Sequence, residues 1–192
     1  SLLEISSERS NINWDLPQLK YLDRLDPQIF FYYIYAVLYS PRYRTKYAEF
    51  LKRDFPRLPI TTDLDLYKKL SDLGERLVEL HLMKAESLSS PSHKFEGAGD
   101  ALVGKRKYDI KTQRVYINDT HYFENIAEEI WNYHIGGYQV LDKWVKDRVG
   151  RRLSSDDQFL FRKIITALEK TIELQEEIDK LYSLIESSLV TN

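Results

Sequence analysis

A long amphipathic stretch near the end of the chain constrains the fold more than any other feature. It begins at Ser154-Ser155-Asp156, a typical helix start, and apolar residues then recur at three- and four-residue spacing. About thirty residues in one helix extend ~45 Å, which is longer than a small domain can cover along its whole length. We therefore expect the helix either to pack along other helices of this chain or to present part of its stripe to another domain. The stripe consists of Phe161, Ile164, Ile165, Leu168, Ile172, Ile178, Leu181 and Ile185.

Three helices are predicted in the first half of the chain, each from its start signal. Asp26-Pro27 and Ser40-Pro41 both place a capping residue before a proline at the first helical position. The first of these helices is so rich in aromatic residues that we expect it to be mostly buried, and the second is expected to run to about Arg53. The third follows Thr61-Thr62-Asp63 and is predicted to be the longest of this half, since leucines recur along it at helical spacing.

The region from Tyr108 to Arg148 carries β signals followed by a helical one. Two short runs rich in β-branched and aromatic residues flank the link 111–113, which is short enough for a hairpin. Next comes Gly136-Gly137, where a positive φ is easily accommodated, and then an amphipathic segment from Tyr138. A small α+β unit is predicted here.

These elements together predict an α+β fold with an N-terminal helical part, a small β-hairpin unit with helices, and a long C-terminal helix. Residues 1–25 are interpreted as a linker leading into the domain and residues 26–86 as a helical subdomain. Residues 87–104, rich in Ser, Gly, Ala and Pro, are predicted to form a flexible connection. Residues 105–192 then form the α+β unit with the long helix.

Composition excludes several classes of protein and site. The chain has no cysteine, which removes disulfides and thiolate metal sites, and it contains no apolar run long enough to span a membrane. The first residues lack the basic start and apolar core of a signal peptide, so a cytoplasmic location is expected. None of the four histidines pairs with another ligand at a metal-binding spacing, so no metal site is predicted.

Basic residues are concentrated in the central third of a chain whose net charge is −2, which suggests one basic face. Lys and Arg can hold phosphates, and Gln can pair with base edges. A solvated surface is the alternative for all of these residues, and for the cluster near the second helix so is contact with a neighbouring domain. The candidate DNA-contacting residues are Arg42, Arg44, Lys46, Lys105, Arg106, Lys107, Lys111, Gln113, Arg114, Gln139, Lys143, Arg151 and Arg152.

Four stretches give the chain a resemblance to a known family. They are residues 133–144 (YHIGGYQVLDKW), 115–118 (VYIN), 30–44 (FFYYIYAVLYSPRYR) and 50–59 (FLKRDFPRLP). They resemble the C-terminal specificity region of type ISP restriction-modification enzymes, bacterial defence proteins in which an N6-adenine DNA methyltransferase is followed by a target-recognition part. The resemblance implies two partners, double-stranded DNA and the methyltransferase domain of the same polypeptide.

The chemistry of that family is not encoded in this stretch. An adenine methyltransferase needs a glycine-rich loop for S-adenosylmethionine and an Asn/Asp-Pro-Pro-Tyr/Phe loop for the flipped base, and the sequence contains neither. We therefore expect no catalytic residue and no cofactor in this chain, with S-adenosylmethionine bound elsewhere in a parent enzyme. The function predicted is non-catalytic recognition of a DNA target. The alternatives are a structural module that docks the methyltransferase without reading bases, and an enzyme whose site the sequence does not reveal.

Overall fold

The computed structural model describes residues 26–56 and 58–190, so the predicted linker at 1–25 lies outside the described residues. The fold is α+β, as predicted, with one very long helix, shorter helices and small antiparallel sheets. No helix within these ranges is both long and apolar enough to cross a membrane. The elements are α1 (Pro27–Tyr39), α2 (Pro41–Lys46), α3 (Ala48–Leu51), α4 (Leu64–His81), the 3-10 turn η3 (Glu86–Leu88), β1 (Phe95–Glu96), β2 (Lys107–Asp109), β3 (Arg114–Tyr116), β4 (Tyr122–Phe123), α5 (Glu128–Trp131), β5 (His134–Ile135), β6 (Tyr138–Gln139), α6 (Val140–Lys146) and α7 (Ser155–Val190).

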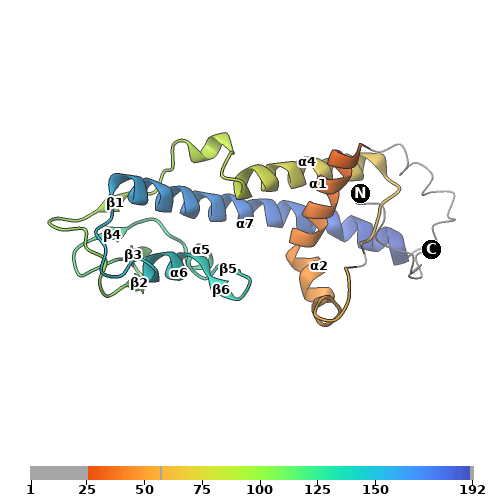
Figure 1. Cartoon of the computed structure of the whole chain (residues 1–192). Coiled ribbons are helices and arrows are strands. Elements are labelled where there is room, and N and C mark those ends of the chain that lie inside the picture. The colour runs from red at the N-terminus through yellow and green to blue at the C-terminus, as the bar shows by residue number, and fades with distance from the viewer. Residues whose placement is uncertain (1–25, 57, 191–192) are drawn as a thin grey trace.

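Helix α7 is the spine of the molecule and runs nearly its whole length (Figure 1). It starts with a reciprocal cap: the Ser154 hydroxyl accepts from the Asp157 amide at 3.1 Å, and the Asp157 carboxylate accepts from the Ser154 amide at 3.2 Å. The first half of its apolar stripe, including Phe161 and Ile165, packs into the core of the β unit. The second half, including Ile178 and Ile185, packs into the helical core with α1, α2 and α4. Of the two expectations for this helix, packing within its own chain is the one observed.

The starts of the first helices agree with the predictions, but the burial of α1 does not. The carboxylate of Asp26 accepts from the Gln28 amide at 2.7 Å at the start of α1. Within α1, however, only Tyr33, Ala36 and Val37 are buried, and Phe31 is 50% exposed. The prediction that α1 is mostly buried was wrong because its neighbours α4 and α7 cover one face and leave the other to solvent.

The second predicted helix is interrupted before its expected end near Arg53. The backbone leaves helical values at Tyr47, with φ −106° and ψ 17°, so that α2 ends there and α3 forms one further turn. At this point the Tyr47 ring packs against Tyr43, with 5.0 Å between the ring centroids. Helix α4 follows the prediction, starting after the Asp63 cap and burying the leucines of its stripe from Leu66 to Leu80.

The β unit contains a four-stranded antiparallel sheet in the order β1-β4-β3-β2. The predicted hairpin is confirmed as β2 and β3, which pair Tyr108 with Val115, and Gln113 closes the turn with φ +52°. A second hairpin, β5–β6, turns at Gly136-Gly137 and was not predicted.

Residues 87–104 contribute directly to the β unit. They supply strand β1, which pairs with β4. The Arg162 side chain donates to the carbonyls of His93 at 2.5 Å and Pro91 at 2.7 Å, and the Val103 amide donates to the Arg151 carbonyl at 2.8 Å. The longest exposed run in this segment is residues 96–100, and residues 87, 89, 90, 92, 94 and 102 are exposed as well. The division of the chain into subdomains at this segment stays a prediction.

A chain of hydrogen bonds links the helices through His81. The Thr171 hydroxyl donates to the Ala167 carbonyl at 2.7 Å, so its oxygen accepts from His81 Nε2 at 3.1 Å. Because Nε2 therefore carries the proton of the neutral ring, Nδ1 accepts from the Tyr35 hydroxyl at 2.8 Å. Burial lowers the pKa of His81. The ring acts as a neutral structural link among α1, α4 and α7.

We expect this histidine to make the fold acid-sensitive. The unfolded chain takes up a proton near the ordinary pKa of about 6.5, whereas the folded chain resists protonation until lower pH. The contribution of His81 to stability is therefore complete above the ordinary pKa of about 6.5. It is lost as the pH falls from that value through the lower pKa of the folded state. The measurement is the thermal unfolding midpoint from about pH 7.5 to about pH 5.5. His81→Gln should flatten this dependence, and His134→Gln, at an exposed site, should leave it unchanged. Equal pH dependence in wild type and His81→Gln would contradict the assignment.

Candidate nucleic-acid interface

Most of the elements that carry the candidate DNA-contacting residues lie on one side of α7. In Figure 1, strands β2 and β3, α6, the β5–β6 hairpin and α2 all lie on the same side of α7, and α4 lies along the opposite side. The candidates are carried by these elements or by the loops next to them. Residues far apart in the sequence are thus brought to a common side, as a nucleic-acid interface requires.

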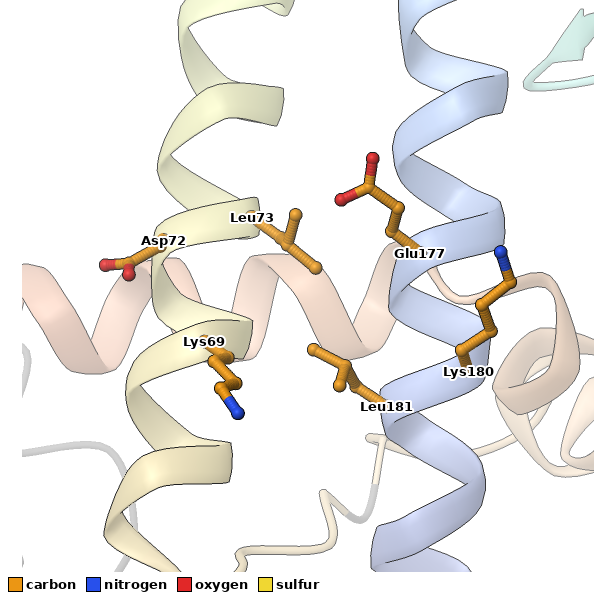
Figure 2. A pocket seen from close by; sticks show the side chains of 6 residues that line it. All are labelled: Lys69, Asp72, Leu73, Glu177, Lys180 and Leu181. Carbon is orange, nitrogen blue, oxygen red and sulfur yellow. The ribbon is translucent and has the colours of Figure 1, made fainter.

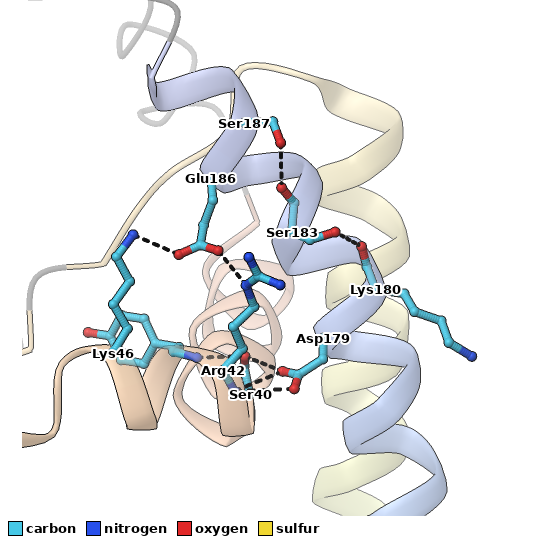
Figure 3. Close-up of polar contacts among 9 residues, drawn as sticks. Ser40, Arg42, Lys46, Asp179, Lys180, Ser183, Glu186 and Ser187 are labelled. Carbon is cyan, nitrogen blue, oxygen red and sulfur yellow. Dashed lines mark hydrogen bonds and ion pairs between the residues drawn. The ribbon is translucent and has the colours of Figure 1, made fainter.

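The basic cluster on α2 is largely used to hold α2 against α7 (Figure 3). Arg42 Nε lies 2.5 Å and Lys46 Nζ 2.8 Å from the two carboxylate oxygens of Glu186. Hydrogen bonds from Lys46 and then Arg42 lower the pKa of that carboxyl group, although its burial opposes the shift. Arg44 has no carboxylate at ion-pair distance among the described residues, and its guanidinium carbon lies 6.0 Å from the Tyr39 ring centre. Arg44 is therefore the α2 cation that is free to meet a ligand.

The same cap region anchors the first turn of α2. The Ser40 hydroxyl donates to Asp179 at 2.5 Å, and the Arg42 amide donates to both oxygens of that carboxylate at 3.2 Å. Figure 3 shows both α7 carboxylates facing α2. The two α7 carboxylates thus bind the cap, an amide and two cations of α2. Arg42 and Lys46 therefore have a structural role within this chain that requires no nucleic acid.

The Lys105-Arg106-Lys107 run points its charges in different directions. Arg106 forms a two-bond ion pair with Asp142 on α6, and its second bond, from Nη2, is 3.0 Å long. Lys105 and Lys107 are exposed and border a shallow hollow beside β2 and β3, which also contains the carboxylates of Asp109 and Asp119. Neither lysine is within 4 Å of a carboxylate in the part of the chain that the structure describes. They are available for a phosphate.

The remaining candidates near the sheet differ in whether their side chains already contact other residues of this chain. Lys111 and Gln113 are exposed in the β2–β3 turn. Arg114 lies over the Tyr122 ring, 4.1 Å from its centre, and its guanidinium is 3.8 Å from Glu124. Gln113 is therefore the freer of the two predicted base-reading glutamines, because the Gln139 amide donates inward to the Trp131 carbonyl at 2.6 Å.

The last candidates lie on α6 and in the loop before α7. Lys143 pairs with Asp147 at 2.7 Å, and Arg152 pairs with Asp100 at the same distance. Arg151 is exposed and has no ion pair within the described ranges. For the paired cations, a contact with phosphate requires an existing ion pair to open. The candidate cations without an ion pair to a described residue are Arg44, Lys105, Lys107, Lys111 and Arg151, and the paired ones are Arg42, Lys46, Arg106, Arg114, Lys143 and Arg152.

Sequence reasoning missed the β5–β6 hairpin as a possible contact element. Ile135 and Tyr138 form a directly opposed pair in it and are both exposed. The signal was present, because two glycines between β-branched and aromatic residues are typical of a two-residue hairpin turn.

The structure brings together no metal-binding set within the described residues. No group of three or more potential metal ligands occurs there. An apolar hollow of about 400 Å³ lies between α4 and α7, away from the candidate residues (Figure 2). Leu73 and Leu181 form its floor, and charged side chains surround them: Lys69, Asp72, Glu177 and Lys180.

Comparison with known proteins gave one family and several structures. The family model described as the Type ISP C-terminal specificity domain matches residues 3–177. A nuclease-deletion mutant of the Type ISP restriction-modification enzyme LlaGI, in complex with a DNA substrate mimic, is 25% identical over 80% of this chain, with a TM-score of 0.58. The ATP-dependent Type ISP enzyme LlaBIII bound to DNA is 21% identical over 83% of this chain, with a TM-score of 0.60. The DrdV–DNA complex is 21% identical over 83% of this chain, with a TM-score of 0.62.

This chain spans only 14%, 12% and 19% of those three chains, respectively. The comparison with curated proteins found no match.

Proposed function

Because this chain belongs to the Type ISP C-terminal specificity domain family, we propose that it recognises the DNA target of a larger restriction-modification enzyme. The family match over residues 3–177 is the observation that carries this proposal. The three solved relatives, which are much longer, are all described as bound to DNA or to a DNA mimic. The position of β2, β3, α6, the β5–β6 hairpin and α2, which carry most of the candidate residues, on one side of α7 supports the same function.

In this proposal the domain holds the duplex and performs no reaction itself. A methyltransferase domain of the same polypeptide, with S-adenosylmethionine, supplies the chemistry on an adenine that is flipped out of the helix. The candidate residues fit that division of labour, because they are cations and amides and include no acid–base pair or metal-ligand set within the described ranges. The partners proposed are double-stranded DNA and that methyltransferase domain.

Contacts with phosphate and with bases fall to different residues. Lys105, Lys107 and Lys111 reach solvent, form no ion pair with any residue that the structure describes, and fit the phosphate backbone. Gln113 lies in the hairpin turn, where its φ is positive, and its exposed side-chain amide can pair with an adenine edge. The docking alternative has less support, since the apolar face of α7 that it requires is covered by the two cores of this chain.

The proposal is tested by selection from a pool of duplexes with a randomised centre, using the complete polypeptide that carries these residues. Sequencing the retained duplexes should give a defined consensus. Binding without any consensus would favour the docking module, because cations alone hold DNA of every sequence alike.

A further inference from the structure

The β5–β6 hairpin displays an apolar pair that the fold does not use. Its turn has φ +56° at Gly136 and +85° at Gly137, the signs that a two-residue type I′ turn requires. Ile135 and Tyr138 pair directly across the strands, so their side chains share one face of the hairpin. They are 49% and 63% exposed, respectively.

The base of this hairpin is held firmly, so the tip is presented in a fixed position. The Gln139 amide donates to the Trp131 carbonyl at 2.6 Å, and Trp131 stacks on Tyr108 of β2 with 5.1 Å between ring centroids. On the other side, the Tyr133 hydroxyl donates to Gln175 of α7 at 3.3 Å. The hairpin is thus tied both to the sheet and to the spine. An exposed apolar pair on so well anchored an element is suited to a contact with a ligand.

The charges beside the tip indicate what kind of ligand fits. Lys143 Nζ, which pairs with Asp147 at 2.7 Å, lies 5.6 Å from the centre of the Tyr138 ring, and Lys146 is exposed at the far end of the same short helix, α6. The hairpin also lies on the side of α7 that carries the lysines of the sheet (Figure 1). An apolar tip with a lysine beside it matches a duplex, in which apolar groups on the base edges lie between two phosphate backbones. The major groove is wide enough for a two-stranded ribbon, and the thymine methyl is the apolar group there.

We propose that the tip of the β5–β6 hairpin enters the major groove and that Ile135 and Tyr138 contact thymine methyl groups, so that this hairpin is a sequence-reading element of the domain. The inference rests on the proposed function and adds a second base contact to the one proposed for Gln113. The cations of the sheet then hold the backbone while the hairpin tip distinguishes the bases.

The experiment uses the complete polypeptide and the duplex selected by the wild type. Each thymine of that duplex is replaced in turn by deoxyuridine, which removes one methyl group and leaves base pairing intact. At one or two positions, binding by the wild type should weaken about four-fold, the effect of one buried methyl group. In Ile135→Ser and Tyr138→Ser the same replacement should have no effect. Leu64→Ser, at a 62% exposed leucine on the first turn of α4, is the matched control and should keep the wild-type response.

The possible results separate this inference from the function on which it rests. Selection of a consensus by the wild type, with loss of the uracil response in the hairpin variants alone, supports both. A consensus that the hairpin variants share with the wild type, with an unchanged uracil response, overturns the hairpin contact and leaves target recognition standing. Failure of the wild type to select any consensus overturns both. Thermal unfolding of each variant confirms that the exposed substitutions leave the fold intact.

Discussion

Replacing Lys105, Lys107 and Lys111 together by glutamine is expected to weaken DNA binding about a hundred-fold at physiological salt. Each phosphate contact releases counterions, and at ~0.15 M salt the release contributes roughly a factor of five per contact. The three lysines are exposed and unpaired within the described structure, so no ion pair has to open before they reach a phosphate. The measurement is the dissociation constant across a salt series. The slope of log affinity against log salt should fall by about 2.7, and the preferred sequence should not change.

A matched control on the other side of the molecule makes this result specific. Lys68 and Lys69 of α4 and Lys180 of α7 allow the same change of three charges around the α4–α7 side. Glutamine at these positions should leave the salt slope as it is in the wild type. If the two triple variants reduce affinity equally, the lysines of the sheet act only through net charge and make no contact with phosphate.

The second large effect is expected in stability, at the point where α1 crosses α4. A Cβ atom at Gly74 would lie 1.9 Å from the carbonyl oxygen of Tyr32, so the helices approach closely only because this residue has no side chain. Gly74→Ala should therefore destabilise the fold by about 3 kcal/mol, the upper part of the range for overpacking, because a backbone atom cannot move aside as a side chain can. The loss should outweigh the roughly 1 kcal/mol that alanine gains over glycine within a helix. Urea denaturation measures the difference.

The neighbouring exposed residue provides the control for this substitution. Glu75→Ala changes the same helical turn without adding an atom at the contact, and it should alter stability by less than about 0.5 kcal/mol. Similar unfolding midpoints for Gly74→Ala and Glu75→Ala would mean that α1 and α4 are not packed as closely as described.

Local chemistry explains why the sequence predicted the helix starts and the first hairpin. Asp26 and Asp63 cap their helices through amides two or three residues away, and the short link 111–113 leaves the strands little choice of partner. The extent to which α1 is buried could not be predicted from such local signals. An aromatic sequence shows how much surface a helix could bury, whereas the number of helices packed around it depends on the whole fold.

Long-range pairing limited the prediction of the interface in the same way. Arg42 and Glu186 are separated by 144 positions in the sequence, and nothing near either residue indicates that they meet. Arg42 and Arg44 therefore look equivalent in sequence, although only Arg44 remains free of a carboxylate in the described structure. The β5–β6 hairpin was within reach of sequence reasoning, because Gly136-Gly137 is itself a turn signal.

Exchange of the domain tests the central claim most directly. In the complete polypeptide, the stretch matched by the family model is replaced by the corresponding segment of LlaGI, and the duplexes that each protein retains from a randomised pool are sequenced. Since we propose that this domain alone reads the target, the hybrid should select the sequence that LlaGI selects and lose the one selected by the wild type. A folded hybrid that still selects the wild-type sequence would contradict the account and place target recognition elsewhere in the polypeptide.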